Sequence, residues 1–266
     1  MPNHHKRAKV FSIVNQKGGV GKTTTVVNLA TAFAAAKKKV LIVDIDPQGN
    51  ASTGFGISQD QRQKTIYEIL VGECHLKSAV VPTRIPDLKI ITSTVDLSAC
   101  EVELANVNKR EFLLRLALKE VIHDFDYILI DCPPSLGMLT INALTASDAV
   151  LIPMQCEFFS LEGLSHLLTT LDLVKENLNP VLTISGIILT MHDRRNKLTE
   201  QVEKDVRDFL KEKVFKNIVP RNVRLSEAPS HGLPGIIYDS KCPGSLAYIQ
   251  LAQEILERES QNTSKS

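Results

Sequence analysis

The most informative part of the sequence is "NQKGGVGKTTT", residues 15–25. It follows an apolar, strand-like run and precedes a helical pattern, which is the setting that a phosphate-binding loop requires. Glycines let successive backbone N–H groups face phosphate oxygens, and the N-terminus of the following helix adds its positive dipole end. The loop departs from the usual G-x-x-x-x-G-K-[ST] pattern because Gln16 stands at the first glycine and Lys17 follows it. The stretch therefore predicts a nucleotide site that has two lysines where one is usual.

The side chains of this loop have predictable roles toward a nucleoside triphosphate. Lys22 is expected to reach the β- and γ-phosphates, and the hydroxyl of Thr23 is expected to ligate Mg²⁺. The other predicted ATP contacts of the loop are Lys17, Gly18, Gly19, Val20, Gly21 and Thr24.

Aspartates end two further strand-like runs. "LIVDIDPQGNAS" carries Asp44 and Asp46, and "YILIDCPPS" carries Asp131. Ligands of parallel sheets bind at the carboxyl ends of the strands, so these side chains are expected beside the phosphates. One carboxylate can orient the attacking water, while others hold the metal through its water shell.

Composition describes a globular chain: 266 residues, 43% hydrophobic and 23% charged, with a formal net charge of +1. No run reaches the ~18 to 20 apolar residues that a membrane-spanning helix needs, so we expect a cytoplasmic protein. The five cysteines show no C-x-x-C pair, which argues against a disulfide framework or a metal cluster and predicts buried thiols. They are Cys74, Cys100, Cys132, Cys156 and Cys242.

Short β-branched runs alternate with helical patterns, which is typical of βαβ units. The strands are expected at residues 9–15, 39–44, 88–92, 126–131, 149–154, 182–189 and 217–219, and the clearest helices at 23–37, 161–178 and 244–259. We predict a P-loop NTPase of the α/β class, in which helices flank a twisted, mainly parallel sheet on both faces. A single domain is expected over 9–259, between flexible tails at 1–8 and 260–266.

Basic residues are concentrated in the window 190–224, which holds ten Lys/Arg and six Asp/Glu, an excess of 10 − 6 = +4. An amphipathic helix is expected from about 197 to 213. By itself the window is compatible with a solvated helix face or with a patch for nucleic acid.

The loop form K-G-G-V-G-K-T resembles the deviant Walker A loop of the ParA/MinD group of ATPases, whose additional lysine reaches the nucleotide of the other subunit. The stretches "DIDPQGNAS", "DCPPSLGMLTINAL", "CEFFSLEGL" and "PRNVRLSEAPSHG" are similar to those of ParA/Soj-type partition ATPases, and the resemblance runs from about residue 10 to 257. It implies an ATP-sandwich homodimer that binds double-stranded DNA nonspecifically on the nucleoid. It also implies slow ATP hydrolysis, stimulated by a ParB/Spo0J-like partner.

The same resemblance assigns roles to individual residues. Lys17 is implied to act in trans, Asp46 to orient water, and Asp131 to be the Walker B aspartate with Asp44 behind it. Met191, Pro220 and Asn222 are implied to contact adenine, and Arg195 and Arg224 to bind DNA.

Other relatives fit the sequence less well. After Leu256 only "ERESQNTSKS" follows, without the apolar face of a membrane-docking helix, so no membrane partner is expected. Cys132 lacks the second spaced ligand of a shared iron–sulfur cluster. The chain begins almost at its first strand, which leaves no room for a helix-turn-helix, so site-specific DNA binding is not expected. Two alternatives stay open: a cargo-positioning ATPase of the same group, and a metabolic P-loop ligase.

Overall fold

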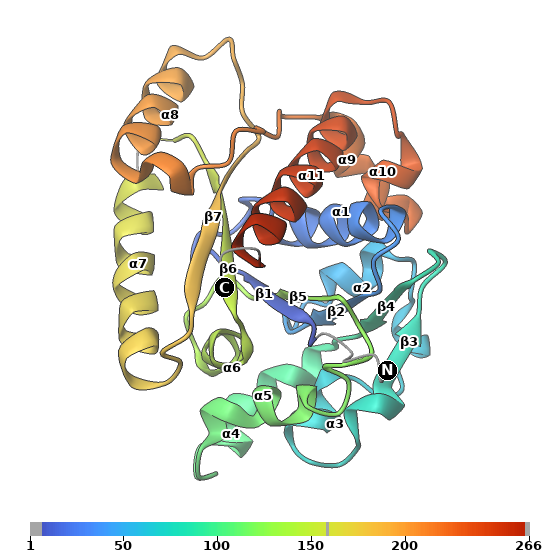
Figure 1. Cartoon of the computed structure of the whole chain (residues 1–266). Coiled ribbons are helices and arrows are strands. Elements are labelled where there is room, and N and C mark those ends of the chain that lie inside the picture. The colour runs from blue at the N-terminus through green and yellow to red at the C-terminus, as the bar shows by residue number, and fades with distance from the viewer. Residues whose placement is uncertain (1–6, 158–159, 264–266) are drawn as a thin grey trace.

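One seven-stranded sheet forms the centre of the molecule (Figure 1) in a computed structural model that describes residues 7–157 and 160–263. The strand order is β3-β4-β2-β5-β1-β6-β7, and every pair is parallel except the antiparallel pair of β3 and β4. The strands are β1 (Lys9–Ile13), β2 (Val40–Asp44), β3 (Val80–Pro82), β4 (Leu88–Ile91), β5 (Tyr127–Asp131), β6 (Ala149–Gln155) and β7 (Thr183–Thr190). The predicted fold class is confirmed.

Helices connect the strands and cover both faces of the sheet (Figure 1). The α-helices are α1 (Lys22–Ala35), α2 (Asn50–Gly54), α3 (Ile66–Leu70), α4 (Cys100–Glu103), α5 (Leu113–Leu118), α6 (Met138–Ala146), α7 (Ser160–Asn177), α8 (Lys197–Leu210), α9 (Val223–Glu227), α10 (Gly235–Tyr238) and α11 (Pro243–Thr263). The 3₁₀ turns are η1 (Gln59–Gln61), η2 (Leu76–Ala79), η3 (Val95–Ala99), η4 (Arg110–Phe112), η5 (Lys211–Lys213) and η6 (Ala228–His231).

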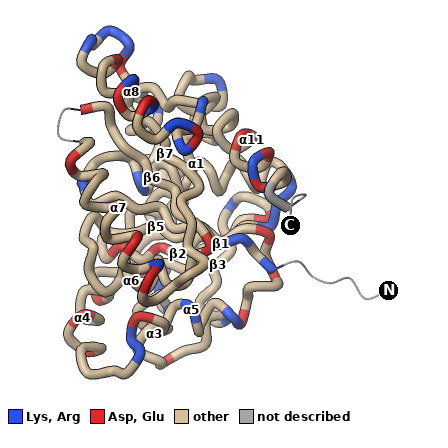
Figure 2. The backbone as a smooth tube through the Cα atoms, turned by 60° about the vertical axis from the view of Figure 1, so that its left-hand side comes forward, with Lys and Arg blue, Asp and Glu red and all other residues tan. Residues whose placement is uncertain are grey.

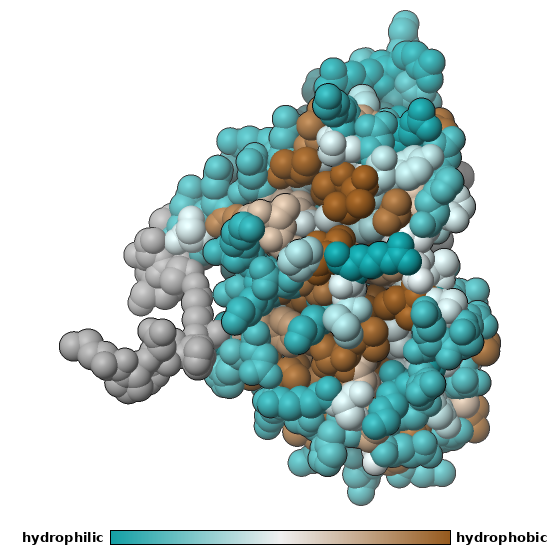
Figure 3. All heavy atoms as spheres, turned by 90° about the vertical axis from the view of Figure 1, so that its right-hand side faces the viewer, coloured by the Kyte–Doolittle hydropathy of each residue, from teal (hydrophilic) through white to brown (hydrophobic). Residues whose placement is uncertain are grey.

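The strands are buried on both faces, so their residues divide between two cores. In β2, Leu41 and Val43 belong to the core under α5, α6 and α7, whereas Val40 and Ile42 belong to the core under α1 and α11. Successive strand residues point to opposite faces, which is why an almost uninterrupted apolar run serves both cores. Figure 3 shows a face of the molecule on which apolar residues gather between polar borders.

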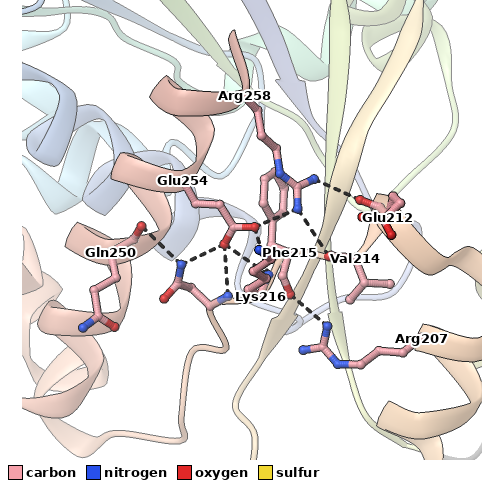
Figure 4. A network of polar contacts seen from close by, with 9 residues as sticks. Arg207, Glu212, Val214, Phe215, Lys216, Gln250, Glu254 and Arg258 are labelled. Carbon is pink, nitrogen blue, oxygen red and sulfur yellow. Dashed lines mark hydrogen bonds and ion pairs between the residues drawn. The ribbon is translucent and has the colours of Figure 1, made fainter. Parts of the chain in front are cut away.

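The expected elements differ from the structure at three places. No strand was expected at β3, a three-residue antiparallel edge strand that ends in proline. Residues 217–219 form no strand; the region makes only isolated bridges, Ile187 with Val214 and His192 with Pro220, because Glu254 takes neighbouring backbone N–H groups (Figure 4). Helix α11 continues to Thr263, into the segment expected to be a tail. The helix expected at 197–213 is confirmed as α8 with η5.

Four of the cysteines are buried free thiols, as predicted, but Cys74 is only half-buried. Among the helices of residues 7–157 and 160–263, none has the length and hydropathy to cross a bilayer.

Candidate nucleotide-binding site

The loop between β1 and α1 has the backbone geometry of a phosphate cradle. Gly19 and Gly21 have φ of +73° and +87°, the left-handed region that glycine enters without strain. A Cβ built on Gly18 or Gly19 would meet nothing within 4 Å, so the loop borders open space. Helix α1 begins without a side-chain cap and without an acidic residue in its first turn. Its N–H groups and dipole therefore favour an anion at this end.

Lys22 lies over the loop, as its predicted role requires. It is only 7% exposed, and its Nζ donates a hydrogen bond to the carbonyl of Lys17 at 3.2 Å. Burial lowers the pKa of this ammonium, while the nearby Asp131, Cys132 and Asp46 act in the opposite direction. A buried cation among carboxylates is well placed to receive a phosphate.

Asp44 and Asp131 are brought together by sheet register, because they are Cα partners at the carboxyl ends of β2 and β5. Asp44 accepts hydrogen bonds from Ser52 N and Oγ at 2.9 and 2.7 Å, so its carboxylate anchors α2. Burial raises the pKa of Asp44 to about 6. Asp46 lies two residues further along, is 7% exposed, and accepts a hydrogen bond from Gln48 N.

Asp131 is the group that fits a metal. Both of its carboxylate oxygens are buried without a hydrogen-bond partner. Burial, with Asp44 beside it, holds the pKa of Asp131 well above its usual value, although the Thr23 hydroxyl and Lys22 act in the opposite direction. Mg²⁺ keeps several waters and takes phosphate oxygens as ligands, so it needs few protein ligands, and Thr23 with Asp131 fits this role.

The proposed adenine contacts come from two segments that run side by side. His192 N donates to Val219 O, and Arg221 N donates to His192 O, which places Met191 near Pro220. Met191 has a φ of +49° and its Cε would lie 3.8 Å from a Cβ on Gly21, so it borders the phosphate loop. Asn222 caps α9 by accepting a hydrogen bond from Arg224 N.

Lys17 has its side-chain partner outside the loop. Its Nζ lies 2.5 Å from Glu157 Oε2, and the two side chains are 41% and 50% exposed. The two lysines of the loop thus have different surroundings: Lys22 is buried over the cradle and Lys17 sits at the surface.

Comparison with known proteins agrees with this geometry. Residues 8–184 match the AAA domain family. The chain is 52% identical over 260 residues to the chromosome partitioning protein ParA of Caulobacter vibrioides, with 97% of each chain covered. The chromosome-partitioning ATPase Soj of Treponema pallidum is 50% identical over 253 residues, 95% of this chain and 99% of Soj. The chain belongs to the ParA/Soj family of partitioning ATPases.

One solved relative contains a bound nucleotide and a metal ion. A protein from Mycobacterium smegmatis described as cobyrinic acid a,c-diamide synthase contains an ATP analogue and magnesium. It shares 33% identity and a TM-score of 0.85 with this ParA/Soj-family chain, over 96% of this chain and 97% of the other.

The two arginines implied to bind DNA lie in different elements of the ParA/Soj fold. Arg195, in the loop before α8, is 89% exposed and forms a two-pronged contact with Asp193 at 3.0 and 2.9 Å. Arg224, in α9, contacts Glu227 at 3.0 Å and Asp239 at 3.7 Å. Figure 2 shows basic residues in the loop above α8 with acidic residues interspersed along the helix. Nearby carboxylates therefore offset part of the local basic charge.

Sequence reasoning missed the residues that fasten the loop to the sheet. Thr190 Oγ1 donates to Val20 O at 2.8 Å, and Gln155 Nε2 donates to Gly19 O at 2.8 Å. Both residues end strands, β7 and β6, so their place at the carboxyl edge was the one available signal.

Proposed function

We propose that this chain is a dimerising ATPase that binds double-stranded DNA nonspecifically in its ATP-bound dimer and leaves DNA on hydrolysis. The cycle would serve chromosome or plasmid partitioning. The observation that carries the proposal is the different setting of the two loop lysines: Lys22 covers its own cradle, whereas Lys17 is exposed on Glu157. A lysine that is not committed to its own site is available to a second subunit.

ATP and Mg²⁺ are the cofactors, in keeping with the solved M. smegmatis relative. Bound Mg²⁺ neutralises charge on the phosphates. Thr23 would hold the metal directly, and Asp44 and Asp131 would hold it through water. Lys22 binds the phosphates, Asp46 orients the attacking water, and Met191, Pro220 and Asn222 contact the base. Lys17 completes the site of the partner subunit.

Hydrolysis is proposed to be slow until a ParB/Spo0J-like partner stimulates it, and the protein is proposed to act in the cytoplasm on the nucleoid. The main alternative function is that of a metabolic ligase on the same fold, because the M. smegmatis relative is described as a synthase. The second alternative is a cargo-positioning ATPase of the same group. A ligase has no reason to respond to DNA.

The test measures DNA binding with ATP and Mg²⁺ for wild type and for the double variant Arg195→Ala/Arg224→Ala. Phosphate contacts supply most of the nonspecific binding energy, so the variant should lose at least about tenfold in affinity at fixed salt. Nucleotide affinity should not change. The matched control is Arg84→Ala/Arg115→Ala, which removes two exposed arginines from other elements and should bind DNA as wild type does.

A second experiment uses Asp46→Ala. This variant should bind ATP and DNA but should not be released from DNA, because only the placement of the attacking water is lost. Wild-type protein that neither binds DNA with ATP nor changes its ATPase rate with DNA would favour the ligase reading. Equal DNA affinity in wild type and the double variant would show that the DNA-binding surface does not depend on Arg195 and Arg224.

A further inference from the structure

Helix α2 is tied to the acidic end of β2 through one carboxylate and one backbone bond. Ser52 donates from both N and Oγ to the Asp44 carboxylate, and Gly49 N donates to the backbone carbonyl of Asp46 at 2.9 Å. Ser93 N, beyond the end of β4, donates in turn to Ser52 Oγ at 3.2 Å. A displacement of Asp44 or Asp46 is therefore passed on to α2 as a whole.

The other end of α2 leads into a backbone contact between two glycines. A Cβ on Gly232 would lie 2.6 Å from the Cα of Gly56, and a Cβ on Gly56 would lie 3.1 Å from the carbonyl oxygen of Gly232. Their φ angles are +63° and +72°. No side chain separates the two segments, so they meet as backbone against backbone with no flexible atoms to absorb a movement.

Gly232 ends η6, which continues directly from α9, the helix that carries Arg224. A cavity of only about 30 Å³ lies where α1, α2 and the α9–η6 segment meet, and Thr23, Asn50 and Leu225 are among its lining residues. This space holds no more than a water, so residues of all three elements border one small gap. The phosphate loop and the Arg224 helix are thus joined through α2.

Arg224 is held by two carboxylates that would respond differently to a movement of α9. Glu227 lies on the same helix and moves with it, whereas Asp239 follows α10 and is already 3.7 Å away. A shift of α9 relative to α10 would break the second contact and leave Arg224 with less neutralising charge.

We propose that α2 transmits the nucleotide state to the DNA-binding surface through the Gly56–Gly232 contact, with the two glycines acting as positioning residues for Arg224. When Mg²⁺-ATP is bound, the charge around Asp44, Asp46 and Asp131 would change, and α2 would shift with these residues. The shift would press α2 against η6, move α9 and free Arg224 for DNA. The inference rests on the proposed function, since it assumes that Arg224 binds DNA.

The experiment compares Gly232→Ala, Gly56→Ala and the control Gly72→Ala. Gly72 has a φ of +83° but a Cβ there would meet nothing within 4 Å, so the control adds the backbone strain without the clash. For each full-length protein, affinity for a duplex of arbitrary sequence is measured with a non-hydrolysable ATP analogue and with ADP, together with analogue affinity and dimer fraction. Gly232→Ala should lose about tenfold or more of the analogue-over-ADP preference, Gly56→Ala less, and Gly72→Ala none.

Coupling free energies are reciprocal, so DNA should tighten analogue binding in wild type and in Gly72→Ala but not in Gly232→Ala. The proposal is supported if Gly232→Ala still binds the analogue and dimerises but no longer binds DNA more tightly with the analogue than with ADP. A full preference in folded Gly232→Ala overturns it, and if circular dichroism shows that this variant does not fold, Gly56→Ala decides by the same measurement. Wild-type protein without any nucleotide-dependent DNA binding would instead overturn the proposed function, and the coupling with it.

Discussion

At the scale of single residues, the nucleotide site is built around a carboxylate that the protein itself leaves without hydrogen bonds. Both oxygens of Asp131 are buried and unpartnered, and Asp44 lies beside it in register. A buried carboxylate in this position destabilises the nucleotide-free protein, because the ionised form is better solvated in the unfolded chain. A cation bound at this point removes that cost, so binding and stability are linked.

Asp131→Asn should therefore stabilise the nucleotide-free protein at pH 7, by about 1 to 3 kcal/mol, because it removes a carboxyl group whose ionisation burial opposes. The added stability that Mg²⁺-ATP gives to wild type should shrink in the variant. Thermal unfolding with and without Mg²⁺-ATP measures both effects. Asp172→Asn, on the exposed side of α7, is the control and should change neither. A variant that melts below wild type without nucleotide would contradict this account of Asp131.

Asp44 gives the nucleotide-free protein a defined pH dependence. Burial raises its pKa from 3.8 to about 6, so between these values the folded state holds a proton that the unfolded state has released. The free energy of unfolding should then fall as pH rises from about 4 to 6, by at most about 3 kcal/mol from this group. Asp44→Asn should make the profile less steep in that window, while Asp131, whose pKa burial also raises, keeps part of the slope. Denaturant unfolding at several pH values tests this, and equal slopes in both proteins would rule the assignment out.

At the scale of elements, the segment after α8 shows where sequence patterns stop being informative. Figure 4 shows Glu254 and Arg258 of α11 reaching residues 212–217. Glu254 accepts hydrogen bonds from Lys216 N, Asn217 N and the Asn217 side chain, and Arg258 lies 4.3 Å from the Phe215 ring centroid. A β-branched run such as 217–219 has strand propensity, but here a carboxylate distant in sequence takes the neighbouring N–H groups.

Glu254→Gln tests this clamp, the set of hydrogen bonds by which Glu254 holds Lys216 and Asn217. Burial would raise the pKa of Glu254, yet the hydrogen bonds from Lys216 and Asn217 lower it on balance, so the carboxylate is ionised and accepting. The amide nitrogen of glutamine would face N–H donors, and the variant should lose about 2 to 3 kcal/mol of unfolding free energy in urea. Glu257→Gln, exposed on the same helix, is the control and should cost little. Equal stability of the two variants would show that the clamp does not hold the segment.

At the scale of the whole molecule, the parallel sheet explains how much of the site was predictable. The ends of β1, β2 and β5 meet at one edge because all three strands point the same way, so the phosphate-loop pattern together with the strand endings predicted that Lys22, Asp46 and Asp131 lie there. Contacts between side chains that are not neighbours in the sequence could not be predicted, because no local sequence pattern indicates them. The pairing of Lys17 with Glu157, 140 positions apart, and the capture of Asp44 by Ser52 depend on how the chain packs.

The pairing of Lys17 with Glu157 bears on how two molecules associate. Both side chains are half exposed, and such surface pairs contribute about 0 to 1 kcal/mol, so the contact can be exchanged for a nucleotide in a second subunit. Lys17→Gln leaves Lys22, Thr23 and the loop N–H groups in place. The variant monomer should bind ATP with near wild-type affinity and fail to dimerise.

Lys22→Gln is the matched variant, because it removes the lysine over the protein's own cradle and should abolish tight ATP binding before a dimer can form. Measuring nucleotide affinity and the ATP-dependent dimer fraction for both variants separates three cases. A Lys17→Gln monomer that loses ATP affinity would place Lys17 in its own subunit's site. Wild-type dimerisation by Lys17→Gln would leave this lysine as a surface cation paired with Glu157. Only retained affinity with lost dimerisation fits a lysine that acts across the interface.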